Sequence, residues 1–225
     1  MGINIAIDGP AGAGKSTIAK QVAAKLSYIY VDTGAMYRAM ALYLLGKGVQ
    51  AEDQDEIAAA CTGAEITIRY EEGVQHVYLN GEDVTGELRT EAVGNMASRS
   101  SANPKVREHL LMLQRSLASE YDVVMDGRDI GTTILPDAQV KIYLTASAET
   151  RADRRYKELV EKGESCDLAT ILKDIVERDE RDMTRAVSPL RQAEDAVLVD
   201  SSNLTIAQVV DEILGICREK AGICL

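Results

Sequence analysis

Positive charge is scarce in this sequence of 225 residues. Its 25 lysines and arginines are outnumbered by 36 aspartates and glutamates, so the formal net charge is −11. Proteins that hold a nucleic-acid backbone need a broad basic face, and this balance argues against nucleic acid as a partner. Local clusters of arginine still occur, and they can bind small anions.

Cysteine and histidine are also few. None of the four cysteines belongs to a C-x-x-C pair, and neither of the two histidines completes a metal-binding cluster with them. We therefore expect reduced cysteines that pack in the interior, and we assign no role to His76 or His109. The cysteines are Cys61, Cys166, Cys217 and Cys224.

Long apolar runs are absent as well. No segment approaches the roughly 20 apolar residues that cross a bilayer, and the N-terminus lacks a basic segment followed by a long apolar stretch. These observations predict a cytoplasmic protein with no membrane partner. The 46% apolar and 27% charged fractions are ordinary for a globular chain, and the length favours a single domain with insertions, which we expect to be a monomer.

Short apolar segments alternate with helical segments along the chain. Residues 3–8 form an apolar run that stops at Gly9, which predicts a buried strand, a loop, and then a helix beginning near Lys15. Because strands that alternate with helices favour parallel pairing, we predict an α/β fold with a five-stranded parallel sheet and helices on both faces. The other predicted strands are 28–32, 122–125, 140–144 and 196–199, and the other predicted helices are 34–45, 149–162, 168–183 and those that begin at Asn103 and Thr205.

The stretch 64–90 has a different pattern. Its residues alternate with period two before and after a turn at Gly73, and Asn80-Gly81 marks a second turn. This pattern predicts a small antiparallel sheet inserted into the larger fold.

A phosphate-binding motif follows the first predicted strand. The segment 9–16 satisfies G-x-x-x-x-G-K-[ST], in which backbone N–H groups surround phosphate oxygens, the lysine reaches the β- and γ-phosphates, and the hydroxyl of Ser16 ligates Mg²⁺. The motif lies between a predicted strand and a predicted helix, which is the context that this mechanism requires. We expect ATP to bind at Gly9, Pro10, Ala11, Gly12, Ala13, Gly14, Lys15, Ser16 and Thr17.

Several classes of protein share this loop. GTPases also need a guanine-reading Asn-Lys-x-Asp, which is absent from the sequence, and the chain is short for a motor with its coupling elements. A kinase that acts on a small acceptor fits the length best.

Four further segments make the sequence similar to bacterial-type cytidylate kinases over nearly its whole length. They are 32–38 (DTGAMYR), 98–107, 126–132 (DGRDIGT) and 178–189, which contains RAVSP. Adenylate kinases, which share the fold, have a different sequence where Gly-Arg-Asp-Ile-Gly stands here. The resemblance implies a P-loop nucleoside monophosphate kinase fold in one kinase domain, 1–225. Within it, it implies a monophosphate-binding region at about 33–100, with the antiparallel insert at 64–90, and a helical lid at about 150–168.

The resemblance also implies where the acceptor nucleotide binds. Arg38, Arg128 and Arg185 would grip its phosphate, since a guanidinium matches phosphate oxygens bidentately and stays charged. Thr33 would add a hydroxyl to the same acceptor site. Residues 98, 107 and 129 would read cytosine, because a carboxylate accepts from the 4-amino group while arginine and serine donate to the ring; they are Ser98, Arg107 and Asp129.

Two of the roles that the resemblance implies also have an ordinary structural explanation. Arg178 and Asp182 would contact the sugar, but residues four apart on a helix also form common surface ion pairs. A cluster of arginines would close over ATP as a lid, or would simply be solvated; its members are Arg151, Arg154 and Arg155.

Asp126 would be the carboxylate near the metal. The residues implied in catalysis are Lys15, Asp126, Arg128 and Arg185.

The implied reaction transfers the γ-phosphoryl group of Mg·ATP to CMP or dCMP, in pyrimidine nucleotide metabolism. The alternative acceptors for a P-loop kinase of this size are UMP, dTMP, AMP or a shikimate-like hydroxyl compound. A binding module without turnover is the remaining alternative, and the intact Lys15, Ser16 and Arg128 argue against it.

Overall fold

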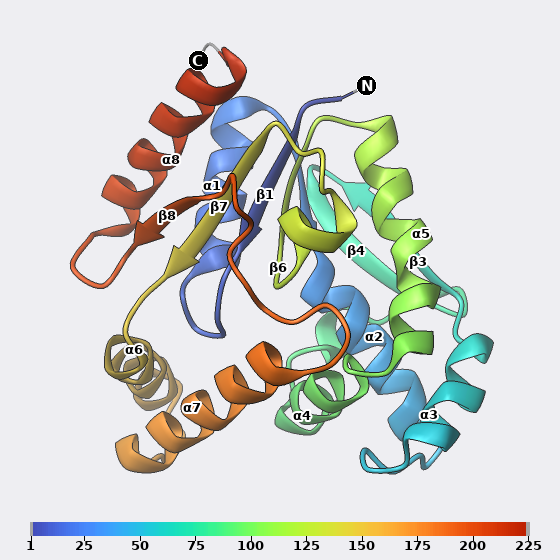
Figure 1. Cartoon of the computed structure of the whole chain (residues 1–225). Helices are drawn as coiled ribbons and strands as arrows, with labels where there is room; N and C mark the ends of the chain where they lie inside the picture. The colour runs from blue at the N-terminus through green and yellow to red at the C-terminus, as the bar shows by residue number, and fades with distance from the viewer. Residues whose placement is uncertain (1, 224–225) are drawn as a thin grey trace. The chain divides into compact units, whose positions relative to one another are not determined.

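The structure is a computed structural model that describes residues 2–223 and divides into two compact units. The first unit holds Gly2 and Ile29–Val123, and the second holds Ile3–Tyr28 and residues 124–223. The elements of each unit can be followed by colour in Figure 1.

The main sheet has five strands in the order β2-β6-β1-β7-β8, so the predicted five-stranded sheet is confirmed. In the second unit, β1 pairs in parallel with β7, where Asp8 faces Tyr143, and β7 pairs in parallel with β8. β1 and β6 are almost entirely buried, as expected for parallel strands covered on both faces. The strands are β1 (Asn4–Asp8), β2 (Ile29–Asp32), β6 (Val123–Gly127), β7 (Val140–Thr145) and β8 (Val197–Asp200).

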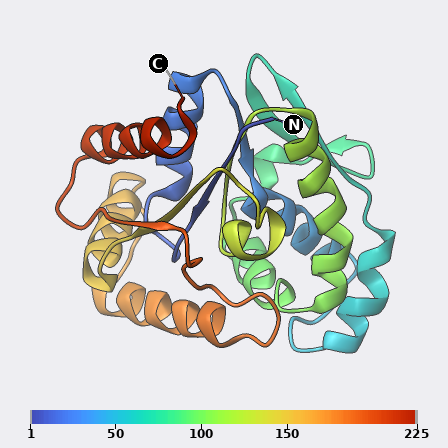
Figure 2. The ribbon, with the colours of Figure 1, turned by 45° about the horizontal axis from the view of Figure 1, so that its top comes forward.

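Two helix pairs accompany these strands in the second unit. The helices α1 (Lys15–Leu26) and α8 (Ile206–Ala221) pack side by side, and α8 also contacts β7 and β8 (Figures 1 and 2). The helices α6 (Ala148–Glu161) and α7 (Leu168–Thr184) pack against each other, and α6 with the turn after it covers the predicted lid range. The loop after β6 continues into a short π-helical turn, η3 (Ile130–Ile134).

The first unit is built around α2 (Thr33–Gly46), which packs against α4 (Glu91–Ser100) and α5 (Pro104–Glu120). α2 begins directly after β2, and the side chain of Asp32 caps it by accepting from the backbone N–H of Ala35. Its buried face includes Met36, Met40 and Leu44. The unit also contains α3 (Gln54–Ala60) and two short 3₁₀ turns, η1 (Cys61–Gly63) and η2 (Thr85–Glu87).

The inserted antiparallel sheet is present in the first unit as predicted. It has the strand order β3-β4-β5, and its antiparallel register pairs Ile66 with Leu79. Glu72 and Gly73 both adopt positive φ at the turn between β3 and β4. The strands are β3 (Ile66–Glu71), β4 (Val74–Leu79) and β5 (Glu82–Asp83).

Cys61 and Cys217 are buried free thiols, as expected, whereas Cys166, also a free thiol, is partly exposed and does not pack fully in the interior. Cys224 lies outside the described residues. Within residues 2–223, no helix is long and apolar enough to span a membrane.

The N-terminus of α8 provides a test of local stability. Thr205 and Gln208 form a capping box. The Thr205 hydroxyl accepts from the Gln208 backbone N–H, and the side-chain Oε1 of Gln208 accepts from the Thr205 backbone N–H at 2.9 Å. We expect Thr205→Ala to lower the free energy of unfolding by about 1 kcal/mol, and Thr205→Ser to lower it much less, because serine keeps the hydroxyl. Urea unfolding of both variants measures this difference, and equal effects of alanine and serine would contradict it.

Candidate active site

The phosphate-binding loop joins β1 to α1 in the second unit. A Cβ on Gly9 would lie 1.9 Å from the carbonyl oxygen of Leu144 in β7, so only glycine lets β1 leave the sheet at this point. Gly12 and Gly14 adopt φ of 76° and 86°, in the left-handed region that favours glycine. The loop thus turns its backbone sharply before α1 begins at Lys15, and this leaves the N-terminus of a helix beside the loop, which favours a bound anion.

Lys15 lies over this loop. Its side chain is buried, and its Nζ donates to the carbonyl oxygen of Pro10 at 2.7 Å. Burial, together with the nearby positive charge of Arg128, lowers the pKa of Lys15, while Asp126, Asp8 and Asp182 oppose the shift. These groups therefore lie close enough to Lys15 to influence one another electrostatically.

Ser16 and Asp126 bring two side-chain oxygen atoms together beside the phosphate-binding loop. The Ser16 hydroxyl donates to the carboxylate of Asp126 at 2.9 Å, and Asp126 is buried near the end of β6. Mg²⁺ in nucleotide sites is held by one or two protein oxygens and completes its shell with water and phosphate, so this pair fits the ion. The residues 2–223 contain no cluster of three or more acidic, histidine or cysteine side chains that would form an all-protein metal cage.

Arg128, which directly follows β6, forms an ion pair with Asp182 on α7. The Arg128 Nε lies 2.9 Å from the Asp182 carboxylate, and Asp182 is buried. Burial raises the pKa of Asp182. The charge and hydrogen bond of Arg128 and the charges of Arg178 and Arg185 together lower it by more than burial raises it, so the pKa of Asp182 is below its usual value. Asp182 is thus an anion among three arginines, rather than one half of an isolated surface pair on α7.

A second ion pair lies beside the first. The Arg185 guanidinium is 3.5 Å from the carboxylate of Asp129, and both side chains are almost fully buried. The Arg185 Nε also donates to the carbonyl oxygen of Ser188, which adopts a φ of 48° in the turn after α7. The second unit therefore brings together the P-loop, Asp126, Arg128, Asp129, Asp182 and Arg185, all of which the sequence predicted.

The predicted lid arginines lie in three different environments. Arg151 is buried and donates to the carbonyl oxygens of Ala146 and Ala11, at 2.9 and 2.8 Å, and to the carboxylate of Asp179. Arg154 donates to the hydroxyl and the carbonyl oxygen of Ser201. Arg155 is exposed and pairs with Glu158 one turn further along α6. The three arginines therefore do not share one contact partner, although they lie on one helix.

In the first unit, Thr33 and Arg38 lie at the start of α2. Thr33 is buried, and an Arg38 guanidinium nitrogen is 4.0 Å from the Asp32 carboxylate. The backbone of Asp32 is held by Gln75 from β4, whose side-chain amide accepts from the Asp32 N–H at 2.8 Å and donates to its carbonyl oxygen at 3.3 Å. The inserted sheet thus supports the corner that carries both predicted residues.

Ser98 and Arg107 also meet in the first unit, through Ser101. The Ser101 hydroxyl donates to the carbonyl oxygen of Ser98 at 2.9 Å, and Arg107 donates to the carbonyl oxygen of Ser101 at 3.2 Å. The guanidinium of Arg107 also lies over the ring of Tyr37, 5.5 Å from its centre. The Ser98 hydroxyl is buried and has no hydrogen-bonding partner among the described residues. A buried hydroxyl without a partner is what a binding site would contain if the ligand supplies the hydrogen bond.

Comparisons with known proteins identify the family to which the chain belongs. The family model of cytidylate kinases matches residues 5–219 of the chain. The chain belongs to the cytidylate kinase family. It is 51% identical over 98% of its length to a cytidylate kinase of Caldicellulosiruptor saccharolyticus, of which it covers 97%, and 47% identical over 97% of its length to that of Bacillus subtilis, of which it covers 98%. Among solved structures, it is similar to a gluconokinase from Sinorhizobium meliloti, with a TM-score of 0.49 and 16% identity over 98% of this chain and 94% of that chain.

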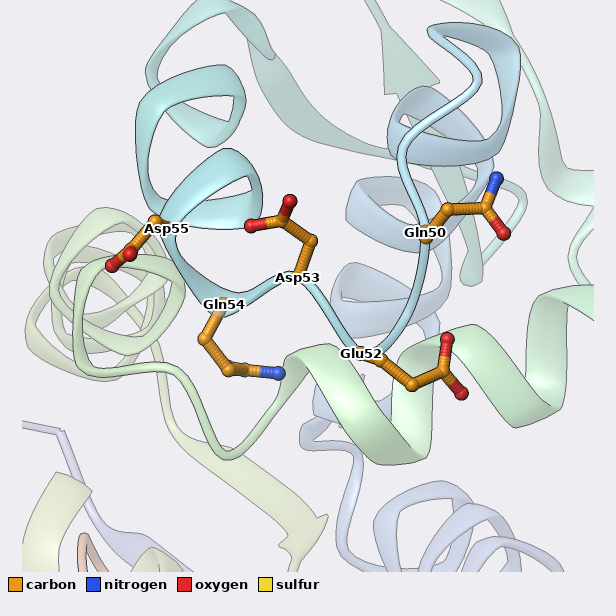
Figure 3. Close-up of a pocket in the computed structure, with 5 residues that line it drawn as sticks. All are labelled: Gln50, Glu52, Asp53, Gln54 and Asp55. Carbon is orange, nitrogen blue, oxygen red and sulfur yellow. The ribbon is translucent and has the colours of Figure 1, made fainter.

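A surface pocket of this cytidylate kinase family member lies in the first unit, at the start of α3 (Figure 3). None of the predicted site residues lines it. Its lining is acidic, which opposes the binding of a nucleotide phosphate. The residues that line it are Gln50, Glu52, Asp53, Gln54 and Asp55.

Two supporting residues of the family member escaped the sequence analysis. Gln75 holds the Asp32 backbone, and Asp179 pairs with Arg151. Because Gln75 lies in a segment with period-two alternation, the sequence predicts only that its side chain and those of its neighbours point to opposite faces of a sheet. Asp179 lies on a helix with many acidic and basic residues. Its partner Arg151 is on another helix, so the spacing of residues in the sequence does not reveal the pair.

The Arg128–Asp182 pair predicts a measurable loss of stability. At neutral pH we expect Arg128→Ala to lower the free energy of unfolding by about 2 kcal/mol, because the buried Asp182 loses its hydrogen-bonding cation. The lowered pKa of Asp182 means that the stabilisation is present above the pKa of the unfolded chain, about 4, and is lost as the pH falls through the lower folded value. The difference from wild type should therefore shrink in acid.

Urea unfolding at neutral and acidic pH tests this expectation. Arg155→Ala is the matched control, because Arg155 is exposed and its pairing with Glu158 contributes little. A double-mutant cycle with Asp182→Asn isolates the pair. Additive effects of the two substitutions, or a loss that does not depend on pH, would contradict the assignment.

Proposed function

We propose that this kinase transfers the γ-phosphoryl group of Mg·ATP to CMP or dCMP, giving ADP and CDP or dCDP. The observation that carries the proposal is the electrostatic cluster of the second unit, in which the P-loop lysine, Arg128 and Asp182 influence one another within a chain of the cytidylate kinase family. Groups suited to a phosphoryl donor and to an acceptor phosphate thus belong to one cluster.

ATP is the expected donor, held by the loop 9–17. Its backbone N–H groups and the start of α1 receive the phosphates, and the buried Lys15 would exchange the carbonyl oxygen of Pro10 for phosphate oxygens. Ser16 and Asp126 would hold Mg²⁺. The ion supplies charge neutralisation on the β- and γ-phosphates when it is bound.

The acceptor phosphate is the proposed ligand of Arg38, Arg128 and Arg185. Each of these arginines already lies beside a carboxylate, namely Asp32, Asp182 and Asp129. Such pairing holds a guanidinium in place before the phosphate arrives, so less side-chain entropy is lost on binding.

Cytosine recognition is assigned to Ser98, Arg107 and Asp129. The Asp129 carboxylate would accept from the 4-amino group, while the Ser98 hydroxyl and the Arg107 guanidinium would bind the ring nitrogen and carbonyl. The unpartnered buried hydroxyl of Ser98 supports this assignment, since a buried polar group costs free energy until a partner binds it. Thr33 adds a hydroxyl at the start of α2, and Arg178 and Asp182 would contact the sugar.

The chemistry needs no general base. The second pKa of a nucleotide phosphate is about 6, so the attacking oxygen is already anionic at neutral pH. Lys15 and the arginines stabilise the charge that spreads over the transferred group, and they are held in place before the reaction, which is the main source of such catalysis. Arg151 fixes α6 to the P-loop backbone, and Arg154 and Arg155 are further along the same helix, where a closing lid would carry them toward ATP.

A panel of acceptors tests the proposed reaction. We expect ADP formation from Mg·ATP with CMP or dCMP to exceed that with UMP, AMP, GMP and dTMP by orders of magnitude. For UMP the rejection should approach about 10⁴-fold, because uracil presents a carbonyl to the Asp129 carboxylate. The measurement is kcat/KM by coupled ADP detection for each acceptor. A preference for another monophosphate would contradict the base assignment, and turnover of a hydroxyl acceptor alone would contradict the reaction.

Substitution of Asp129 tests base recognition directly. We expect Asp129→Ala to lower kcat/KM for CMP by about 100-fold or more and to reduce the preference for CMP over UMP, because the acceptor of the 4-amino group is lost. Asp137→Ala is the matched control, since Asp137 is an exposed carboxylate on the loop that follows the same turn. An unchanged ratio of CMP to UMP activity in Asp129→Ala would show that another residue reads the base.

A further inference from the structure

Asp8 is a buried carboxylate that none of the roles above uses. It is the last residue of β1, directly before the phosphate-binding loop, and it is 5% exposed. Its two oxygens accept hydrogen bonds from two consecutive backbone N–H groups, those of Ile130 and Gly131, each at 2.8 Å. One side chain thus holds the first residues of the η3 turn at two points.

These two N–H groups are the kind that normally need a cap. The first N–H groups of a helical turn have no partner within the turn, and the residue before the turn usually supplies one from its own side chain. That residue here is Asp129, a type well suited to capping, yet its side chain makes no capping hydrogen bond. Asp8 supplies the cap from another strand, and the Asp129 carboxylate is left to face Arg185 at 3.5 Å.

The space around the turn leaves little freedom for another arrangement. A Cβ added to Gly131 would lie 3.1 Å from the Lys141 Cδ and 3.5 Å from an oxygen of Asp8. Lys141 is itself held, because its ammonium group pairs with Asp195 at 2.8 Å. The space beside Gly131 is therefore filled by the stem of Lys141 and the carboxylate of Asp8.

The electrostatic cost of Asp8 supports a functional reason for its presence. Burial raises the pKa of Asp8 to about 7; the nearby Asp129 adds to the rise, and the hydrogen bonds from Gly131 and Ile130 and the charge of Lys15 oppose it. A raised pKa means that burial of the charged form destabilises the folded chain as the pH rises from the unfolded pKa of about 4 toward 7. The ionised form of Asp8 therefore opposes folding near neutral pH, and its hydrogen bonds from Ile130 and Gly131 offset part of that cost.

We propose that Asp8 is a positioning residue for the acceptor base: it caps the turn at Ile130 and Gly131 and so presents the Asp129 carboxylate toward the site. The proposal rests on the proposed role of Asp129 in reading cytosine. It also connects the end of the strand that leads into the ATP-binding loop with the residue that selects the acceptor.

The substitution Asp8→Asn tests the proposal with little change in volume. The asparagine oxygen can keep one hydrogen bond, but its amide nitrogen would face the other backbone N–H, so the two-point contact is lost. We expect kcat/KM for CMP to fall and KM for CMP to rise by about tenfold, with the preference for CMP over UMP reduced by a similar factor. The dissociation constant of ATP, measured by binding in the absence of acceptor, should change less than about twofold.

Hydrogen exchange followed by mass spectrometry provides a readout that does not depend on activity. The segment 129–134 should exchange faster in Asp8→Asn than in wild type, while α8 should be unchanged. Gly131→Ala disturbs the same contact from the other side and should give the same pattern, which keeps the test valid if Asp8→Asn folds poorly. Asp200→Asn is the matched control, because Asp200 also ends a strand and accepts from a backbone N–H two residues on, but is exposed.

The outcomes separate the possible roles of Asp8. Weaker ATP binding with an unchanged preference for CMP over UMP would overturn the proposal and assign Asp8 to the phosphate-binding loop. Lower stability with unchanged specificity and unchanged exchange at 129–134 would overturn it in favour of a purely structural role. If wild type itself does not prefer CMP, the role of Asp129 fails instead, and faster exchange at 129–134 would still support the capping of the turn by Asp8.

Discussion

The pairing of buried or partly buried arginines with buried carboxylates is the interaction on which the second unit's site depends. A guanidinium cannot lose its charge, so it can be buried only beside an anion, and each buried anion in turn needs a cation or several N–H groups. Arg128 with Asp182 and Arg185 with Asp129 satisfy both conditions. These pairs join the end of β6 to α7 and the turn after it, and they hold the arginines that we assign to a phosphate.

Such a network is costly, and its cost favours a role in binding. A buried ion pair often stabilises a fold no more than apolar residues of the same size would, so stability alone does not explain its presence. The same holds for the buried hydroxyl of Ser98, which has no partner among the described residues. Groups of this kind are preorganised for a charged and polar ligand, and a nucleotide supplies both a phosphate and hydrogen-bonding base edges.

The sequence predicted the elements well where a local signal was strong. The apolar run before Gly9, the glycines of the loop and the capping box at Thr205 each correspond to an observed boundary. It did not predict α3 and α4. α3 is short and buries only Ile57, and α4 contains Gly94, Asn95 and serines, which are weak helix formers, so tertiary packing rather than propensity stabilises them.

The sequence proposes the candidate site as a list of residues but not as a set of contacts. Arg178 and Asp182 are four residues apart, which suggests a pair within one helix, but Asp182 also accepts a hydrogen bond from Arg128, which directly follows β6 and lies 54 residues away in the sequence. Gln75 and Asp8 gave no signal at all, because a lone polar residue in a strand has no spacing that reveals its partner. Partners that lie on different elements are decided by the fold, and a single sequence does not contain that information.

The attachment of the P-loop to later parts of the chain has a consequence during protein synthesis. The loop residues lie within the first 17 positions, but Gly9 packs against Leu144, and the carbonyl oxygen of Ala11 accepts from Arg151, which in turn pairs with Asp179. β1 also needs β7 beside it. A nascent chain on the ribosome therefore lacks the neighbours that shape its loop until β7, α6 and α7 have also been synthesised, so competence to hold a nucleotide is acquired well after the motif itself is translated.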